Sequence, residues 1–264
     1  MQNMVPILFL QPALSLAIAT GAILYWRHSR SFRGVALLLG AGAYFIAIAA
    51  KEVLNLTAYV SLVSIFGEQS VPVAVLLGLE TVLLEVGLAY LFAAYGKKRG
   101  LARSDAVPYG LGLAFWENGV LLGALTLFGY VVLYLILLTP STIASAVYQQ
   151  LQSNSPALFL PPGSLLPSVL LGALERVSSE LAHIAWGVLV VLSAVTGRKR
   201  YLAFALPMGL IDALVPFGSY NIDLFETVVF LLSVGFLGIA AWSYASERKA
   251  VSQREANLPQ PAQS

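Results

Sequence analysis

Long apolar stretches separated by short basic loops constrain this chain of 264 residues more than any other feature. An α-helix needs roughly 20 apolar residues to cross the hydrocarbon core of a membrane, and the stretches have about this length or more. Hydrophobic residues make up 58% of the chain and charged residues only 11%, which excludes a soluble globular enzyme. The sequence predicts an all-α integral membrane protein, a bundle of about seven transmembrane helices.

Basic residues gather in short clusters between the apolar stretches: Arg27, Arg30 and Arg33; Lys97, Lys98, Arg99 and Arg103; Arg198, Lys199 and Arg200; Arg248, Lys249 and Arg254. Lys and Arg beside membrane spans mark the cytoplasmic side. The alternate connections, at 56–71, 139–166 and 218–223, contain neither residue type. We therefore predict a multi-pass protein of the cell membrane, with the N-terminus outside and the C-terminus inside. The clusters are topogenic, so we expect the lipid bilayer and no nucleic acid as a partner.

Seven spans place every basic cluster on one side, and we predict them at 5–26, 34–55, 72–95, 106–138, 167–196, 201–217 and 224–245. They form a single transmembrane domain, 1–246, followed by a polar, disordered cytoplasmic tail, 247–264. The fourth and fifth spans are longer than a bilayer needs, so each is either one tilted or kinked helix or a broken one. The proline-rich segment Thr139–Pro167 is expected to be an outer loop that covers a cavity.

Several ionisable residues are left inside the apolar stretches: Lys51, Glu80, Glu85, Glu117, Glu175, Arg176, Glu180, His183 and Asp212. Such groups cost several kcal/mol in hydrocarbon, so they face the bundle interior and by default mark a functional site. The predicted spans place them at similar depths on different helices. We therefore expect Glu85, Glu117, His183 and Asp212 to converge on one polar cavity near the middle of the membrane.

Some of these residues also have purely structural interpretations. Arg176 and Glu180 lie four residues apart, which predicts an ion pair within one helix. Lys51 is expected near the outer interface, where its long side chain reaches water. Asp212 lies between two prolines and could bond backbone groups in a kinked helix. His183 is either a hydrogen-bonded interior histidine or a ligand.

Glu85 and Glu117 have no basic neighbour in their own helices. Each is then protonated or faces water or a cation, with Arg176 as one candidate.

Four segments carry a family resemblance: LEVGLAY at 84–90, DAVPYGLGLAFWEN at 105–118, ERVSSELAHI at 175–184 and MGLID at 208–212. In order and spacing they resemble the YhfC family of intramembrane metallopeptidases, which are related to CAAX-processing membrane proteases. The resemblance implies that glutamates and histidines from several helices hold a divalent metal, zinc or another, and activate water.

Carried over to this chain, the resemblance implies Glu85, Glu117 and His183 as catalytic residues. The implied metal ligands are His183, Glu117, Glu85 and Asp212, and the implied polar network is Glu175, Arg176, Glu180 and Asn118.

Four positions depart from the family pattern: Val86, Ala89, Leu113 and Met208. Glu85, Val86 and Ala89 stand where the family has a double glutamate and an arginine, and Leu113 and Met208 stand where it has histidines. Catalytic zinc usually binds two or more histidines, and cysteine is absent from the chain.

Two classes of function remain open, with a third behind them. The first is an intramembrane hydrolase in which Glu85 or Glu117 is the general base and the substrate is a membrane-embedded peptide. The second is a noncatalytic homologue that binds a partner helix, a lipid or a precursor. The third is an ion-coupled transporter, which no internal repeat supports.

Overall fold

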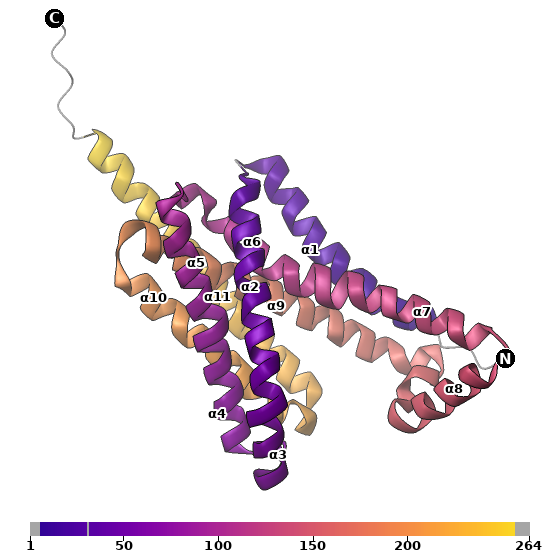
Figure 1. Cartoon of the computed structure of the whole chain (residues 1–264). Coiled ribbons are helices and arrows are strands. Elements are labelled where there is room, and N and C mark those ends of the chain that lie inside the picture. Colours follow the sequence, from indigo (N-terminus) through magenta and orange to yellow (C-terminus); the bar gives the residue numbers. More distant parts are fainter. Residues whose placement is uncertain (1–5, 31, 257–264) are drawn as a thin grey trace, which may run out of the picture.

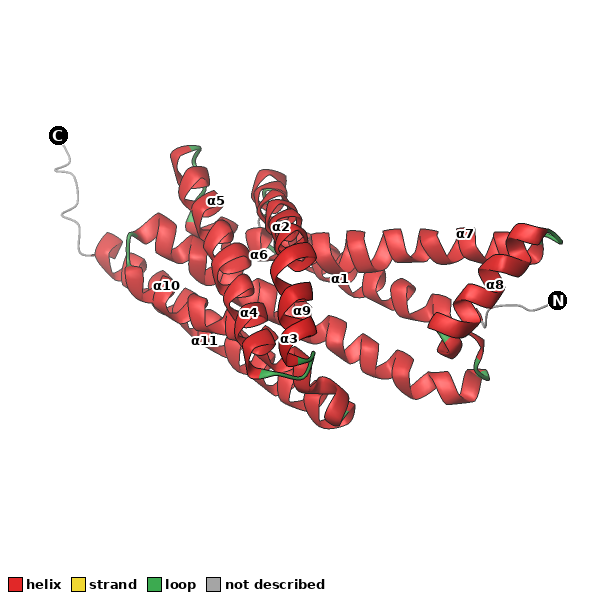
Figure 2. Ribbon diagram, turned by 60° about the horizontal axis from the view of Figure 1, so that its bottom comes forward, coloured by secondary structure: helices red, strands yellow, loops and turns green. Residues whose placement is uncertain are grey.

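A computed structural model of the chain describes residues 6–30 and 32–256; residues 1–5, 31 and 257–264 lie outside the description. Every regular element in the described ranges is a helix (Figures 1 and 2). In chain order the helices are η1 (Pro6–Phe9), α1 (Leu10–Ser29), α2 (Gly34–Leu54), η2 (Asn55–Tyr59), α3 (Val60–Phe66), α4 (Val71–Glu80), η3 (Thr81–Val86), α5 (Gly87–Lys98), η4 (Arg103–Asp105), α6 (Ala106–Ala114), η5 (Phe115–Leu125), α7 (Thr126–Leu138), α8 (Thr142–Asn154), η6 (Pro156–Phe159), α9 (Pro162–Thr196), α10 (Lys199–Ala205), η7 (Leu206–Tyr220) and α11 (Ile222–Ala256).

These elements join into helices that are long and apolar enough to cross a membrane, and the described residues contain 7 of them. They cover Ile7–Ser29, Gly34–Phe66, Val71–Lys98, Arg103–Leu138, Pro162–Thr196, Lys199–Tyr220 and Ile222–Ala250. The all-α, multi-pass architecture predicted from the sequence is confirmed. The two long apolar stretches are each one continuous helical segment, which resolves the alternative of broken helices.

The second span differs from the prediction in its length. It continues beyond residue 55 through η2 and α3 to Phe66 and is 33 residues long. Because of this extension, Lys51 lies well inside the span and not at its end.

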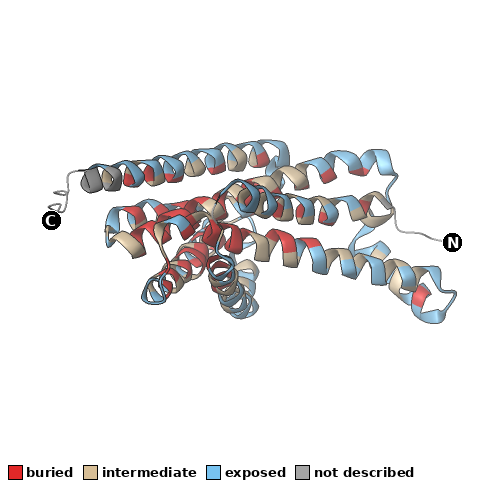
Figure 3. Cartoon of the chain, turned by 90° about the horizontal axis from the view of Figure 1, so that it is seen from above, coloured by how far each residue is buried: buried red, intermediate tan, exposed pale blue. Residues whose placement is uncertain are grey.

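Helix α9 is the central helix of the bundle, with 72% of its most apolar window buried against other helices. Large apolar side chains on other helices remain exposed, as expected where they meet lipid: Leu38, Leu83, Phe128 and Leu231 are examples. In Figure 3 the buried residues gather where the helices pack around the middle of the molecule, and the projecting ends are largely exposed.

Helices α2, α6 and α9 approach one another through glycine. A side chain at Gly112 would place its Cβ 2.0 Å from the Leu37 carbonyl oxygen of α2. At Gly187 of α9, a Cβ would lie 2.4 Å from the Cα of Gly110 in α6. Small residues allow such close backbone contact between membrane helices. These contacts fix α2, α6 and α9 relative to one another; α2, α9 and η5, which continues α6, carry several of the polar residues described below.

The segment Thr139–Pro167 is not the irregular loop that its prolines suggested. It contains α8 and η6, and Pro162 already begins α9. Helix α8 lies at the far end of an arm formed by α7 and the first turns of α9, away from α4 and α5 (Figure 1).

The polar C-terminal segment also begins as helix, because α11 continues to Ala256. The expectation of a disordered tail from residue 247 is therefore wrong for its first ten residues, 247–256, and residues 257–264 lie outside the described residues. Glu247 anchors this end of α11, since its carboxylate accepts hydrogen bonds from Arg198, Arg200 and Tyr201.

Candidate functional site

Three of the site carboxylates lie where a helix departs from regular α geometry. Glu85 belongs to the π-helical turns of η3, Glu117 to the π-helical turns of η5, and Asp212 to the 3-10 helix η7. Such turns change which face of a helix a side chain occupies, and π turns are frequent at functional sites. Ser15 of α1 supports η5 by donating a 2.7 Å hydrogen bond to the Asn118 carbonyl.

His183 on α9 lies between two of these carboxylates. Its Nε2 is 3.3 Å from Glu85 Oε2, and its Nδ1 is 3.3 Å from Glu117 Oε2. Nδ1 is also 2.8 Å from the carbonyl oxygen of Ser179 one turn earlier. A carbonyl can only accept a hydrogen bond, so Nδ1 carries a proton and Nε2 is directed at Glu85. The rings of Tyr44 and Trp186 pack against the imidazole and fix its plane.

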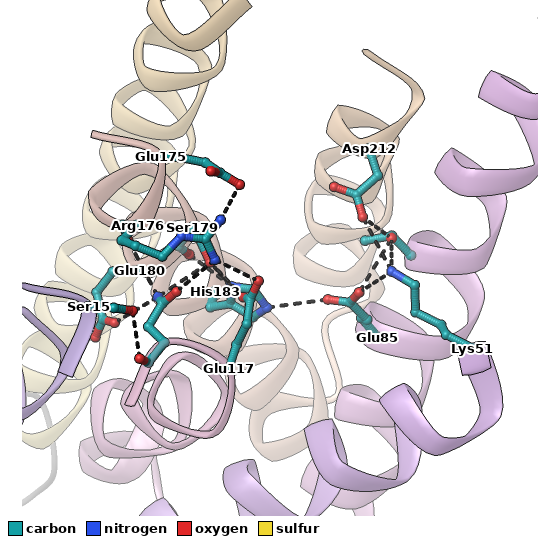
Figure 4. A network of polar contacts seen from close by, with 12 residues as sticks. Ser15, Lys51, Glu85, Glu117, Glu175, Arg176, Ser179, Glu180, His183 and Asp212 are labelled. Atoms are coloured by element: carbon teal, nitrogen blue, oxygen red, sulfur yellow. Dashed lines mark hydrogen bonds and ion pairs between the residues drawn. The ribbon is translucent and has the colours of Figure 1, made fainter. Parts of the chain in front are cut away.

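Lys51 lies on the other side of Glu85. Its ammonium donates to Glu85 Oε1 at 2.5 Å, to the Thr81 hydroxyl at 2.9 Å and to Asp212 Oδ2 at 3.4 Å. Thr81 in turn donates to Asp212 (Figure 4). The prediction that Lys51 reaches water at the outer interface is wrong, because its side chain is only 13% exposed and is directed into the bundle. We call Lys51, Thr81, Glu85 and Asp212 the lysine cluster.

Arg176 forms a second group around Glu117. Its guanidinium donates to Glu175, to Glu117 Oε1 at 3.4 Å and to Asn118 Oδ1 at 3.3 Å. The Ser179 hydroxyl donates to the other oxygen of Glu117 at 2.6 Å. We call Glu117, Asn118, Glu175, Arg176 and Ser179 the arginine cluster (Figure 4).

Glu180 does not pair with Arg176, so the predicted ion pair within α9 is wrong. The arginine side chain reaches across to η5, where Glu117 and Asn118 are both available. Glu180 instead accepts a 3.2 Å hydrogen bond from Asn118, and its other oxygen is buried without a partner among the described residues.

A cavity of about 380 Å³ connects the two clusters. Its charged lining residues are Lys51, Glu52, Glu85, Glu117, Glu175, Arg176, His183 and Asp212. Much of the remaining wall is apolar and comes from Ile48, Leu77, Ile211, Val215, Phe225 and Val229. None of the residues of 139–167 whose side chains the structure describes belongs to this lining, so the structure gives no support to the expected cover from that segment.

The structure thus brings together Glu85, Glu117, His183 and Asp212, as expected from the cost of burying charge in hydrocarbon. Sequence reasoning missed three participants: Lys51, Thr81 and Ser179. Lys51 carried a signal, since only it and Arg176 among the basic residues lie outside the loop clusters. The two hydroxyl groups carried none, because serine and threonine are common in membrane helices.

These features define a multi-pass α-helical membrane protein with a charged cavity of about 380 Å³ inside its transmembrane bundle. A comparison with known families then identifies its family: the model of the YhfC intramembrane metalloprotease family matches residues 14–220. The match covers more than half of the chain, and the protein belongs to this family. Neither a curated protein nor a solved structure shows a significant match to it.

The family implies a divalent metal, but the residues present do not fit one. Within the described ranges, no group of three or more His, Cys, Asp or Glu residues is arranged to hold a metal ion. Glu85 and Asp212 share the Lys51 ammonium, and Glu117 pairs with Arg176.

Leu113 and Met208, where the resemblance led us to expect histidines, are buried in the hydrophobic core. His183 is thus the one imidazole at a site whose carboxylates already have cations.

Proposed function

We propose that this protein binds a membrane-embedded peptide segment in its cavity and holds it through charge, hydrogen bonds and apolar contact, without metal-dependent cleavage. One observation carries the proposal: the chain's own cations, Lys51 and Arg176, engage the carboxylates that would otherwise serve as ligands and general base. The activity lost is metal chemistry, whereas the cavity that receives a substrate is retained.

The lining of the cavity suits an apolar segment with one basic residue. The apolar wall formed by Ile48, Leu77 and Val229 matches hydrophobic side chains of a peptide. Carboxylates outnumber cations in the lining, with Glu52, Glu85, Glu117, Glu175 and Asp212 against Lys51 and Arg176. Because complementary potential selects a partner, a peptide that carries Lys or Arg is favoured over one that carries Glu.

A second candidate function is the metallopeptidase activity for which the family is named. The orientation of His183 favours this activity, because the Nδ1 bond to the Ser179 carbonyl leaves Nε2 directed into the cavity. Metal-ligating histidines are commonly oriented by such a backbone contact. Catalysis would require Glu85 or Glu117 to exchange its present cation for a water molecule.

Site-specific photo-crosslinking tests the proposal with defined peptides. A photoreactive residue at Ile48, which lines the cavity, is compared with one at Ile46, which is exposed on the same helix. The probes are hydrophobic 20-residue peptides of the length that crosses a bilayer, carrying a central Lys, norleucine or Glu. We expect capture at Ile48 to follow the order Lys, norleucine, Glu, and capture at Ile46 to ignore the central residue.

The same reactions separate the two candidates. Mass spectrometry of the Lys peptide after incubation with protein and Zn²⁺ or Mn²⁺ should return it intact. Fragments cut by the wild-type protein but not by Glu117→Gln would support the peptidase instead. Equal capture at Ile46 and Ile48 for all peptides would contradict a binding role for the cavity.

A further inference from the structure

We propose that Lys51 is the resident cation of the cavity, and that its ammonium group fills the position at which this donor set would otherwise bind a divalent ion. The inference deepens the proposed function and rests on it, because it explains why the cavity works without a metal. It makes Lys51 a positioning residue: it holds Glu85 and Asp212, and through Glu85 it sets the partner of His183.

The ammonium group uses all of its hydrogen-bonding capacity. Lys has three donors and no acceptor, and Nζ contacts three oxygens, from Thr81, Glu85 and Asp212. The three come from two different spans, while Lys51 itself belongs to a third. An amine held in this way has no free donor for a substrate, which argues against a role for Lys51 as a nucleophile or proton donor.

The two carboxylates of the lysine cluster require a positive charge between them. Glu85 is 4% exposed, and the Thr81 hydroxyl contacts both Glu85 and Asp212. In the described parts of the chain, no other Lys or Arg side chain pairs with either carboxylate. Asp212 is 34% exposed, whereas Glu85 is buried, and two ionised carboxylates that share one hydroxyl repel each other beside a buried group unless a cation or a proton lies between them.

The groups around Nζ are also those that divalent cations prefer. Carboxylate and hydroxyl oxygens bind Mg²⁺ and Mn²⁺, and imidazole adds affinity for Zn²⁺ and Co²⁺. His183 is not part of this donor set, because its Nε2 lies 3.3 Å from the second oxygen of Glu85, on the side away from Lys51 (Figure 4). The donors around Nζ are therefore oxygens alone, two carboxylates and one hydroxyl, and the ammonium occupies the space between them. Removing its positive charge should leave a position where a divalent ion, completed by water, can bind between the two carboxylates.

Substitution of Lys51 tests the inference by metal binding, with no need for enzymatic activity. Lys51→Met keeps an unbranched apolar stem without the charge, and Lys51→Arg is the matched control that keeps it. Each purified protein is titrated with Co²⁺, whose visible absorption reports coordination, and its bound metal is counted by elemental analysis. We expect about one Co²⁺ per chain in Lys51→Met, and at least about tenfold less in wild type and Lys51→Arg.

A second substitution identifies the ligands. Glu85→Gln in the Lys51→Met background should abolish the absorption, because an amide oxygen is a much weaker ligand than a carboxylate. Glu52→Gln in the same background is the control, because Glu52 lines the cavity but forms no hydrogen bond or ion pair with the described side chain of Lys51, so uptake should be unchanged. Stoichiometric uptake by the wild type, or none by folded Lys51→Met, would overturn the inference.

The role of Lys51 can still be tested if the Lys51→Met protein is unstable. Should Lys51→Met accumulate only when Co²⁺ or Mn²⁺ is present during purification, this rescue would itself support the exchange of one cation for the other. If metal fails to rescue it while Lys51→Arg folds normally, the exchange is contradicted. Peptide capture at Ile48 is measured in the wild type alone, so a failure there concerns the proposed function and not the role of Lys51.

Discussion

Different interactions hold α2, α9 and the helix formed by α6 and η5 together in the two halves of the bundle. In the half that carries the basic loops, backbones touch through Gly40, Gly110, Gly112 and Gly187, and there is no space for a methyl group. Further along, Arg176 of α9 pairs with Glu117 of η5, and Lys51 of α2 is linked to His183 of α9 through Glu85 of η3. These side chains line the cavity. The first half is packed rigidly, because backbone atoms in direct contact cannot move apart easily. The second half depends on the balance between its carboxylates and its cations.

The difference indicates how the family architecture can persist while its chemistry changes. The glycine contacts set the positions of the helices, and they do not depend on which ion or side chain occupies the cavity. Leu113 and Met208 are part of the hydrophobic core and do not line the cavity. A site of this kind can lose a metal and retain a binding function.

Breaking the glycine contacts should have the largest effect. Gly112→Ala would place a Cβ 2.0 Å from the Leu37 carbonyl oxygen and 2.9 Å from the Ala41 nitrogen, both backbone atoms. Overpacking costs about 1–3 kcal/mol where side chains can adjust, and more where they cannot. We expect little monodisperse protein after detergent extraction, measured by size-exclusion chromatography and thermal unfolding.

Gly129→Ala in α7 is the matched control, because a Cβ there meets nothing within 4 Å. Its stability should be unchanged or higher by about 0.5–1 kcal/mol, since alanine favours a helix over glycine. Equal behaviour of the two variants would show that α2 and α6 are not in backbone contact.

Removing the charge of Lys51 should have the next largest effect. Lys51→Ala leaves Glu85 buried with no Lys or Arg partner, and breaking a buried ion pair from one side costs about 3–5 kcal/mol. Thermal unfolding in one detergent measures the loss, with the exposed Lys249→Ala as control. Adding Glu85→Gln should recover part of the loss, because it removes the uncompensated charge. A double variant less stable than Lys51→Ala would contradict this account.

Arg176→Ala should cost less than Lys51→Ala. Its partners are more accessible to water, with Glu117 19% and Glu175 43% exposed, and Glu117 keeps its bond from Ser179. Loss of hydrogen bonds to charged groups costs about 1.5–3 kcal/mol. The sequence alone suggested the reverse order, because it placed Lys51 at the membrane interface. Thermal unfolding of both variants in the same detergent shows which substitution costs more stability.

The spans and the convergence of the acidic residues could be predicted from the sequence because the hydrocarbon core imposes both. Apolar length determines where a helix crosses, and the cost of buried charge directs Glu85, Glu117 and Asp212 inward. Depth along a helix was harder to predict. The second span extends to Phe66 because residues 56–66 remain apolar enough for helix, and this extension alone moves Lys51 into the bundle.

The pairing of charges could not be predicted either. Spacing along one helix favoured Glu180 as the partner of Arg176, whereas the π turns of η5 present Glu117 and Asn118 to it from a neighbouring helix. A π turn has no simple sequence pattern, so the face that Glu117 occupies follows only from the packed structure.

The smallest effect within the charged half is expected at Ser179, and it tests whether charge or hydrogen bonding stabilises the arginine cluster. Ser179→Ala removes one 2.6 Å bond to Glu117, which retains Arg176 and His183 as neighbours. A single hydrogen bond of this kind contributes about 0.5–1.5 kcal/mol. Ser64→Ala, which removes an exposed hydroxyl bonded to the Ser61 carbonyl, is the control and should be neutral in thermal unfolding. If Ser179→Ala proves as costly as Arg176→Ala, then Glu117 is held mainly by the hydroxyl and not by the arginine.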